Sequence, residues 1–346
     1  MPKAKEILLH KLARAKRKFL KSILHRIGRD NPVRYCGLEA CSLCQLDCVG
    51  CYMRKFPRDM GYLKLKDFKR FVRLNPSIEE IELSNDGEIF LNPGLIEIIK
   101  YAYAKDIKLT AKNGVNFNTV SDDMLKTLVE YEFGAMTISI DGSSPEVYAK
   151  YRRNGNFDAV ISNIKKLRVH MGGELKKDKL DLSWQYIILP STDDEKEIKR
   201  AKKMAGELGM RIFFKRDDNG YYPRNPAMIE SECGLSYDKD SCFQSNIKRR
   251  YFPCWELFNS PRIGYDGAFL GCCCHPWRKL PLPNCFESKL DGYASSGIVK
   301  DIRAMIQGGT IPRGVACADC RFFKEMARSG KYVRDEELMP DYKFWL

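Results

Sequence analysis

Hydrophobic and polar positions alternate regularly between about residue 33 and residue 216. Short apolar runs of strand length are separated by longer stretches in which apolar residues recur every three or four positions, the spacing of an amphipathic helix. Helices are expected near residues 65–74, 94–105, 121–132, 157–170 and 193–208. Strands are expected at Val33–Ala40, Ile78–Ser84, Lys108–Ala111, Ala135–Ile140, Leu180–Leu189 and Met210–Phe214.

Turn and capping residues mark several ends of these elements. Asn92-Pro93-Gly94 opens the second helix, Ser121 can cap the third, and Gly209 follows the helix that ends near Leu208. Strands that alternate with helices predict an α/β fold with a parallel sheet, open or curled into part of a barrel. Ligands in such folds bind at the carboxyl ends of the strands, so the residues that follow each strand are the candidates for a site.

The alternation stops after Asp217. Residues 217–253 are rich in Tyr, Asn, Pro and Asp, and we expect a long irregular connection there. Cysteines are dense from Cys254 onward, which predicts a second, smaller domain over residues 254–346. The expected order is a basic helix over residues 1–32, a barrel over 33–216, the connection, and the small domain.

Three cysteines lie close together after the first expected strand, where residues 44–52 read CQLDCVGCY. The chain shows no secretory signal, so clustered cysteines favour a metal over disulfides. Three thiolates can hold three irons of a cubane and leave the fourth iron open. Zinc needs a fourth protein ligand, for which Cys36 or Cys41 is available. The candidate ligands are Cys44, Cys48 and Cys51.

Together with Tyr52, this loop resembles the signature of the radical S-adenosylmethionine (SAM) superfamily. Residues 86–93, which read DGEIFLNP, are similar to the family's Gly-Gly-Glu-Pro segment, and only Gly87 and Glu88 match it. In relatives that segment holds the amino group of the SAM methionine. Lys112-Asn113-Gly114 resembles the Thr-Asn-Gly turn that follows the third strand in the family.

The stretch after the fourth expected strand continues the resemblance. Ser139 and Arg152 match positions that contact the methionine carboxylate in relatives, and Asp141-Gly142 is expected to form a turn. The resemblance implies a partial (β/α)6 barrel similar to a TIM barrel. It also implies that SAM is bound by Tyr52, Gly87, Glu88, Asn113, Ser139 and Arg152.

A second group of cysteines resembles the ligands of auxiliary-cluster domains called SPASM and, in a shortened form, Twitch. Tyr265-Asp266-Gly267 is expected at the tip of a hairpin that precedes Cys272. No cysteine follows Cys320, which matches the Twitch form, and the spacing is closest to that of the 2-deoxy-scyllo-inosamine dehydrogenases. The resemblance implies one auxiliary [4Fe-4S] cluster, with zinc as the alternative. Its ligands would be Cys254, Cys272, Cys317 and Cys320.

The remaining cysteines are expected to be small apolar fillers of the core, with two exceptions. Epimerases of the superfamily use a thiol to return a hydrogen atom to a substrate radical. Cys233 and Cys242 lie in the connection that should pass near the barrel mouth, so they are the candidates for this hydrogen donor.

The resemblance implies an enzyme that uses SAM, a [4Fe-4S] cluster and a low-potential electron donor such as flavodoxin or ferredoxin. A 5′-deoxyadenosyl radical would abstract a hydrogen atom from the substrate, giving dehydrogenation or epimerisation. We expect a carbohydrate or aminocyclitol, because many peptide-modifying relatives carry a peptide-recognition domain longer than the 32 residues before the first expected strand. Modification of a ribosomally made peptide is the alternative.

The net charge of +14 is concentrated near the N-terminus, where residues 1–29 hold ten Lys and Arg against the single acid Glu6. Such a helix either lies on an anionic membrane surface or docks its apolar stripe on the main domain. No apolar stretch is long enough to span a membrane, so we expect a cytoplasmic protein with peripheral membrane contact. The apolar stripe comprises Leu8, Leu12, Phe19, Ile23 and Ile27.

A zinc-stabilised nucleic-acid-binding protein is the alternative of a different class. It would use the basic helix and structural CxxC modules, and it would bind RNA or DNA with a strong dependence on salt. The basic run has little aromatic interleaving, and Glu88, Asn113 and Ser139 have no role in that scheme. We therefore do not expect nucleic acid as the partner.

Overall fold

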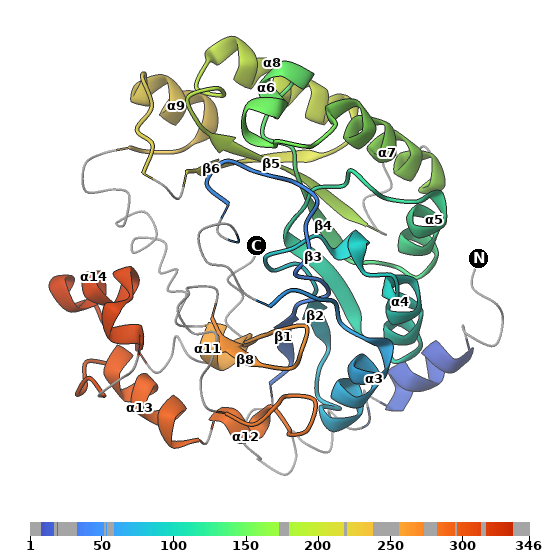
Figure 1. Ribbon diagram of the computed structural model, residues 1–346, viewed down its shortest axis with the longest axis vertical. Coiled ribbons are helices and arrows are strands. Elements are labelled where there is room, and N and C mark those ends of the chain that lie inside the picture. Colours follow the sequence, from blue (N-terminus) through green and yellow to red (C-terminus); the bar gives the residue numbers. More distant parts are fainter. Residues whose placement is uncertain are drawn as a thin grey trace.

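The computed structural model describes eight strands in a single sheet with the order β6-β5-β4-β3-β2-β1-β7-β8 (Figure 1). The described residues are 8–16, 19, 33–51, 53, 59–172, 180–217, 220–237, 256–272, 282–294, 296–312 and 316–334. The strands are β1 (Tyr35–Leu38), β2 (Glu80–Glu82), β3 (Lys108–Val115), β4 (Ala135–Ser139), β5 (Asp181–Ile188), β6 (Arg211–Arg216), β7 (Arg262–Ile263) and β8 (Phe269–Gly271).

Strands β1 to β6 pair in chain order and all run parallel, which confirms the six predicted strands and the α/β class. The register places Ile81 opposite both Cys36 and Leu109. Strand β3 is longer than predicted, and its pairing with β4 shifts register between Ala111 and Val115. The expected Lys112-Asn113-Gly114 turn therefore forms an irregularity within the strand.

Helices cover the outer side of this sheet (Figure 1). Ser121 accepts a hydrogen bond from the Met124 amide at 3.2 Å, so it caps α5 as predicted. The two faces of β5 are both buried from Trp184 to Ile188, as expected for a parallel strand with side chains packed on either side. The five predicted helices are confirmed as α3 (Leu65–Leu74), α4 (Leu95–Ala104), α5 (Asp122–Glu130), α7 (Phe157–His170) and α8 (Glu195–Glu207).

Among the described residues before residue 254, three short elements were not predicted: η1 (Ile89–Leu91), α6 (Pro145–Tyr151) and α9 (Pro226–Cys233). The last corrects the expectation of an irregular connection over residues 217–253. Asn225 caps α9 by accepting from the Met228 amide, and Gly234 ends it with a φ of 68°. Asn-Pro at the start and Gly at the end are strong helix signals, but eight residues are too few to show an amphipathic period.

The C-terminal segment begins as an extension of the barrel sheet. Strand β7 pairs parallel with β1 and antiparallel with β8, and the predicted hairpin tip is present, with Gly267 at a φ of 84°. Whether residues 254–346 form a separate domain stays a prediction. The helices that follow β7 or flank it are α11 (Glu256–Asn259), α12 (Asp291–Ala294), α13 (Gly297–Ile306), η3 (Ala316–Asp319) and α14 (Arg321–Ser329).

Residues 8–16 are helical, which agrees with the helix predicted over residues 1–32, most of which lie outside the described residues. The apolar side chains Leu8 and Leu12 are each 58% exposed. The alternative in which the apolar stripe docks on the main domain is therefore wrong for this part of the helix. None of the helices in the described ranges has the length and apolar composition that crossing a membrane requires.

Candidate functional site

The predicted site residues that the structure describes gather where the barrel strands end. The loop with the three cysteines follows β1, Gly87 and Glu88 follow β2, Asn113 lies near the end of β3, and Ser139 ends β4. Arg152 caps the C-terminus of α6. Tyr52, Cys242 and Cys254 lie outside the described residues.

The cysteine loop is held by backbone hydrogen bonds to the C-terminal end of α6 and the residues that follow it. The amide of Asp47 donates to the carbonyl of Arg153 at 2.9 Å, and the amide of Val49 donates to the carbonyl of Tyr151 at 3.0 Å. All three thiols are free, with Cys48 buried. Burial raises the pKa of Cys44 to about 11, with smaller contributions from the Glu88 carboxylate and from the Cys48 and Cys51 thiols, whose negative charges disfavour a thiolate nearby.

Arg152 reaches the cysteine loop directly. Its Nη1 lies 3.4 Å from Cys48 Sγ, and its Nε donates to Asp141 Oδ2 at 2.8 Å, with Nη2 on the same oxygen. The other oxygen of Asp141 accepts the Ile187 amide at 2.7 Å. The pKa of Arg152 is raised because Asp141 and Cys48 both favour its charged form, against the effect of burial. Arg152 therefore delivers a fixed positive charge to the Cys48 sulfur.

Asp141 adopts the predicted turn conformation, with a φ of 52°, but it does more than turn the chain. Its side chain is fully buried and orients Arg152 through the two bonds just described. Next to it, the Ser143 amide and hydroxyl both donate to the buried carboxylate of Glu197 on α8, at 2.6 and 2.8 Å. The turn is thus anchored to the helix layer, which holds Arg152 in place.

Gly87 lies against the backbone of the cysteine loop. A Cβ at this position would lie 2.7 Å from the Leu43 carbonyl oxygen and closer still to that of Cys41. The next residue, Glu88, donates its amide to the same Leu43 carbonyl at 2.7 Å. Only glycine permits this approach, so the segment after β2 sets the position of the first cysteine.

The side chain of Glu88 is buried and points to backbone amides. Its oxygens accept from Asn116 at 2.5 Å and from Phe90 at 3.3 Å. Burial raises its pKa to about 7, although these amides favour the charged form. The carboxyl group therefore joins the segment after β2 to the loop after β3.

Asn116 is a site residue that the sequence did not indicate. Its Nδ2 lies 3.6 Å from Cys44 Sγ, and its Oδ1 accepts from Gln45 Nε2 at 2.9 Å. Its own amide is the one bound by Glu88. The run of asparagines at 113, 116 and 118 is the signal that could have found it, because amides at strand ends often contact ligands.

Ser139 and Gly114 contact each other across adjacent strand ends. A Cβ at Gly114, whose φ is 121°, would lie 2.5 Å from Ser139 Oγ. The hydroxyl of Ser139 also accepts from Gln185 Nε2 at 3.4 Å. Ser139 is buried, and its hydroxyl faces the strand end that Gly114 leaves open.

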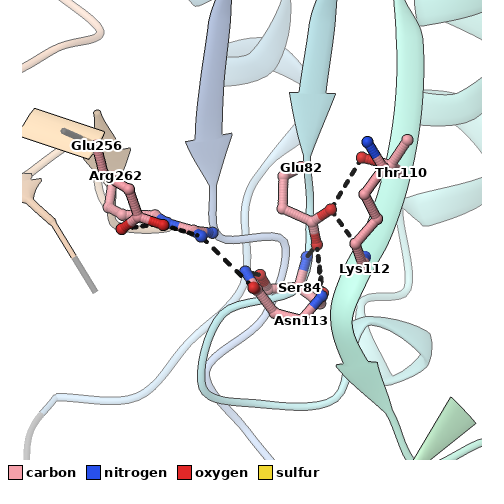
Figure 2. A network of polar contacts seen from close by, with 7 residues as sticks. All are labelled: Glu82, Ser84, Thr110, Lys112, Asn113, Glu256 and Arg262. Carbon is pink, nitrogen blue, oxygen red and sulfur yellow. Dashed lines mark hydrogen bonds and ion pairs between the residues drawn. The ribbon is translucent and has the colours of Figure 1, made fainter. Parts of the chain in front are cut away.

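A polar network links the C-terminal segment to the ends of β2 and β3 (Figure 2). Arg262 on β7 donates to Glu256 at 2.8 Å and to Asn113 Oδ1 at 3.5 Å, and both charged side chains are buried. Asn113 in turn donates from Nδ2 to the Ser84 carbonyl at 2.9 Å. Glu82 fixes the same irregular part of β3, because its carboxylate accepts a hydrogen bond from the Lys112 amide at 2.8 Å.

The predicted hydrogen donor Cys233 lies at the end of α9, a helix that packs against α8. Burial raises the pKa of its thiol to about 12, and the charges of Lys202, Glu232 and Asp193 act on it. Lys202 belongs to α8, so this thiol is on the helix-layer side of the structure. The predicted auxiliary ligands Cys272 and Cys317 are buried and Cys320 is half-buried.

N–H groups point at two sulfurs of the described cysteine loop, Cys44 Sγ and Cys48 Sγ. Such second-layer hydrogen bonds are typical partners of metal-bound and cluster-bound thiolates. No three His, Cys, Asp or Glu side chains within the described residues converge on one point.

Comparison with known proteins agrees with this geometry. Residues 39–205 match the model of the radical SAM superfamily. AlbA of Bacillus subtilis, an antilisterial bacteriocin subtilosin biosynthesis protein, is 30% identical over 131 residues, which are 37% of this chain and 29% of AlbA. The mycofactocin maturase MftC of Mycobacterium tuberculosis is 26% identical over 129 residues, 36% of this chain and 32% of MftC. The matches thus span about a third of these relatives.

Solved structures show the same fold. SuiB of Streptococcus suis bound to the precursor peptide SuiA superposes with a TM-score of 0.61 at 12% identity, covering 92% of this chain and 78% of SuiB. BtrN in complex with AdoMet and 2-DOIA gives a TM-score of 0.52 at 13% identity, covering 91% of this chain and 99% of BtrN. The sheet of six parallel strands is therefore the partial TIM-like barrel predicted from the sequence.

Proposed function

We propose that this chain, which is a radical SAM enzyme using SAM and a [4Fe-4S] cluster, modifies a peptide substrate. The match to AlbA carries the proposal, because AlbA acts in the biosynthesis of a bacteriocin, and bacteriocins are peptides. The match to a maturase supports it. The carbohydrate or aminocyclitol expected from the sequence has weaker support, since the likeness to BtrN concerns the fold alone.

Cys44, Cys48 and Cys51 would hold the cluster, and the site after β2 to β4 would hold SAM. Together these cofactors supply a carbon radical that removes a hydrogen atom from an unactivated C–H bond. Arg152 donates toward Cys48 Sγ, and Asn116 donates toward Cys44 Sγ. Such hydrogen bonds stabilise the thiolate forms and influence the reduction potential of whatever the sulfurs bind.

The other residues of the site hold the cysteine loop, Arg152 and Asn113 in position. Gly87 and Glu88 bind the cysteine loop to the ends of β2 and β3, and Asp141 fixes the orientation of Arg152. Arg262 holds Asn113 from the C-terminal side. Glu88, Asp141 and Arg262 are buried, and so is the Cys48 thiol that Arg152 contacts.

The experiment is turnover with the anaerobically reconstituted full chain, SAM and a chemical reductant. Short peptides encoded beside the gene would be compared with 2-deoxy-scyllo-inosamine and related aminocyclitols, and products would be analysed by mass spectrometry in light and deuterated water. The proposal expects a peptide lighter by two hydrogens, or one that has gained a deuterium at carbon. The variant Cys48→Ala is the inactive control. Conversion of an aminocyclitol with every peptide unchanged would overturn the proposal.

The C-terminal cysteines would hold the auxiliary cluster in this proposal. Cys317 and Cys320 lie at the two ends of one turn, in which the Cys320 amide donates to the Cys317 carbonyl at 2.9 Å. Iron and sulfide analysis distinguishes an auxiliary [4Fe-4S] cluster from a structural zinc site. The variant Cys317→Ala/Cys320→Ala should lose about half of the bound iron and sulfide if a second cluster of equal size is present. Loss of one zinc with unchanged sulfide would instead show a structural zinc site.

A further inference from the structure

We propose that the helix of residues 8–16 is a docking surface for an anionic lipid bilayer and lies in the plane of its headgroups. The proposal is independent of the substrate. It is carried by the direction in which the apolar side of this helix faces, by the chemistry beneath the helix, and by its charge.

The apolar stripe of the helix is exposed. Leu8 and Leu12 are four residues apart and so lie on one face. Each is 58% exposed, and Leu9 beside them is 44% exposed. Three large apolar side chains exposed on one short helix are costly in water, so they mark a surface that is covered in use.

The helix attaches to the barrel by its opposite side. His10 is about 200° around the helix axis from Leu8. Its ring packs edge-on against Tyr103 with the centroids 4.1 Å apart, and its Nε2 lies 3.1 Å from Asp106 Oδ1. Both contacts hold the stripe away from the protein. Figure 1 shows this helix at the periphery of the molecule, beside α3 and α4.

The surface beneath the helix is partly charged. A cavity of about 490 Å³ lies there, lined by His10, Asp106, Lys108, Glu132 and Asp181 together with aromatic and apolar residues. Turning the helix to bury Leu8 and Leu12 would break the contact between His10 and Asp106 and bring apolar groups against the charged part of this lining, which is unfavourable. The polar attachment is therefore the arrangement that the barrel surface favours.

The positive charge of the helix favours an anionic lipid surface as the partner. Lys11, Arg14 and Lys16 are exposed, residues 8–16 contain no acid, and the helix lies in a stretch of net charge +9. Lys11 and Lys16 lie within about 80° of Leu8 around the helix axis, whereas Arg14 lies on the side of His10. The two lysines beside the apolar stripe can reach the lipid phosphates while the stripe enters the acyl boundary. A second copy of the chain fits poorly, because two such faces would bring like charges together. A nucleic acid would leave the apolar stripe without a role.

Two lysines of the neighbouring helices lie close to one aromatic ring of α4. Lys69 on α3 and Lys105 after α4 place their Nζ atoms 5.4 and 5.5 Å from the centre of the Tyr101 ring. Asp106 lies two residues before the start of β3, so the attachment is at the amino end of this strand, whereas the cysteine site lies at the carboxyl ends of the strands. Docking through this helix would leave the mouth of the barrel open.

The test is flotation of the full chain with vesicles of phosphatidylcholine alone or with about a third phosphatidylglycerol. We expect binding to the anionic vesicles only, and weaker binding when salt rises from about 0.1 to 0.5 M. Lys11→Gln/Arg14→Gln/Lys16→Gln should weaken partitioning about a hundredfold. Leu8→Ser/Leu12→Ser should weaken it about tenfold or more at unchanged charge.

The matched control variants carry the same kinds of substitution at exposed residues elsewhere in the chain. Lys126→Gln/Lys199→Gln/Lys203→Gln removes three exposed lysine charges elsewhere, and Val169→Ser/Ile311→Ser removes two exposed apolar side chains. Both controls should float like the unaltered chain. Equal loss in a control and its counterpart, or no flotation with anionic vesicles, would overturn the proposal. Sedimentation that shows a dimer abolished by Leu8→Ser/Leu12→Ser, without vesicle binding, would assign the face to a second copy.

Discussion

Asp141 and Arg152 form a buried ion pair in which Arg152 Nε lies 2.8 Å from Asp141 Oδ2 while Nη1 of the same guanidinium lies 3.4 Å from Cys48 Sγ. One carboxylate thus controls the direction of the only positive charge that the described contacts place on this sulfur. The arrangement couples the turn after β4 to the loop after β1.

Replacing Asp141 by Asn should therefore affect both stability and the cysteine site. The guanidinium would stay buried without its anionic partner, and we expect a loss of about 3 kcal/mol in the free energy of unfolding, measured with denaturant. The midpoint potential of the reconstituted protein should also shift, because Arg152 would no longer be fixed against Cys48. Asp123→Asn is the control, since Asp123 has a side chain that is 85% exposed and should change stability by less than about 0.5 kcal/mol. An Asp141→Asn protein with both properties unchanged would contradict this role.

Gly87→Ala should displace the cysteine loop, because the added methyl group would collide with the carbonyl oxygens of Cys41 and Leu43. We expect reduced iron content after reconstitution and a loss of at least about 2 kcal/mol in stability. Gly206→Ala on α8 is the matched control, since nothing lies within 4 Å of its added Cβ. That change should stabilise the helix by up to about 1 kcal/mol. Equal iron content in Gly87→Ala and the unaltered chain would show that the loop tolerates the methyl group.

The buried carboxyl group of Glu88 should make stability depend on pH. Burial raises its pKa to about 7, above the value near 4.5 of an exposed glutamate, so folding favours the protonated form. Its contribution is fully present below about pH 4.5 and is lost as the pH rises to about 7, by up to about 3 kcal/mol. Above pH 7 the contribution is constant.

Glu88→Gln tests this dependence, because glutamine does not titrate. The difference in the free energy of unfolding between the two proteins should change between pH 4.5 and 7 and be level above that range. A difference that is independent of pH over the whole range would mean that Glu88 is charged in the folded protein throughout.

The Arg262–Glu256 pair should behave as a buried pair rather than a surface one. Arg262→Met should cost about 3 to 5 kcal/mol, because it leaves the Glu256 carboxylate buried without its partner. The double variant Arg262→Met/Glu256→Met should recover most of that loss. Lys126→Met in the exposed pair with Asp122 should change stability by less than about 1 kcal/mol. Additive losses in the double variant would show that the two residues do not act together.

Cys233→Ala should leave turnover within about twofold of the unaltered enzyme, because the thiol lies at α9 among charges from the α8 side. The measurement is the rate of product formation at saturating substrate. Abolished turnover, together with normal iron content and stability, would restore Cys233 as a hydrogen donor.

Most of the barrel could be predicted because its signal is local. Each long strand and helix carries its own hydrophobic period, and Ser121 and Gly209 mark helix ends through short-range hydrogen bonding and backbone freedom. The helices α6 and α9 carry too few residues for a period, so they were missed. The three cysteines were found because their spacing on one loop is itself the signal.

The contacts among the site residues could not be predicted, although Asn113 and Arg152 were expected in the site, because these contacts depend on which loops become neighbours in space. Asn116 contacts Cys44 across 72 residues, and Arg152 reaches Cys48 across 104. Arg262 contacts Asn113 across 149 residues. Nothing in the local sequence of any of them indicates the partner, and only the pairing of the strands decides it.

The pairing of β7 with β1 has a consequence for how the chain is made. The amides of Gly37 and Glu39 donate to the carbonyls of Pro261 and Ile263, each at 2.9 Å, so β1 is completed by a strand that is synthesised more than 200 residues later. Until then β1 has an open edge that can pair with another chain. Folding must wait for a contact of very long sequence separation, which slows it and extends the time during which nascent chains can aggregate. Yield in a cell should therefore depend on translation speed and chaperone supply more than the stability of the finished barrel suggests.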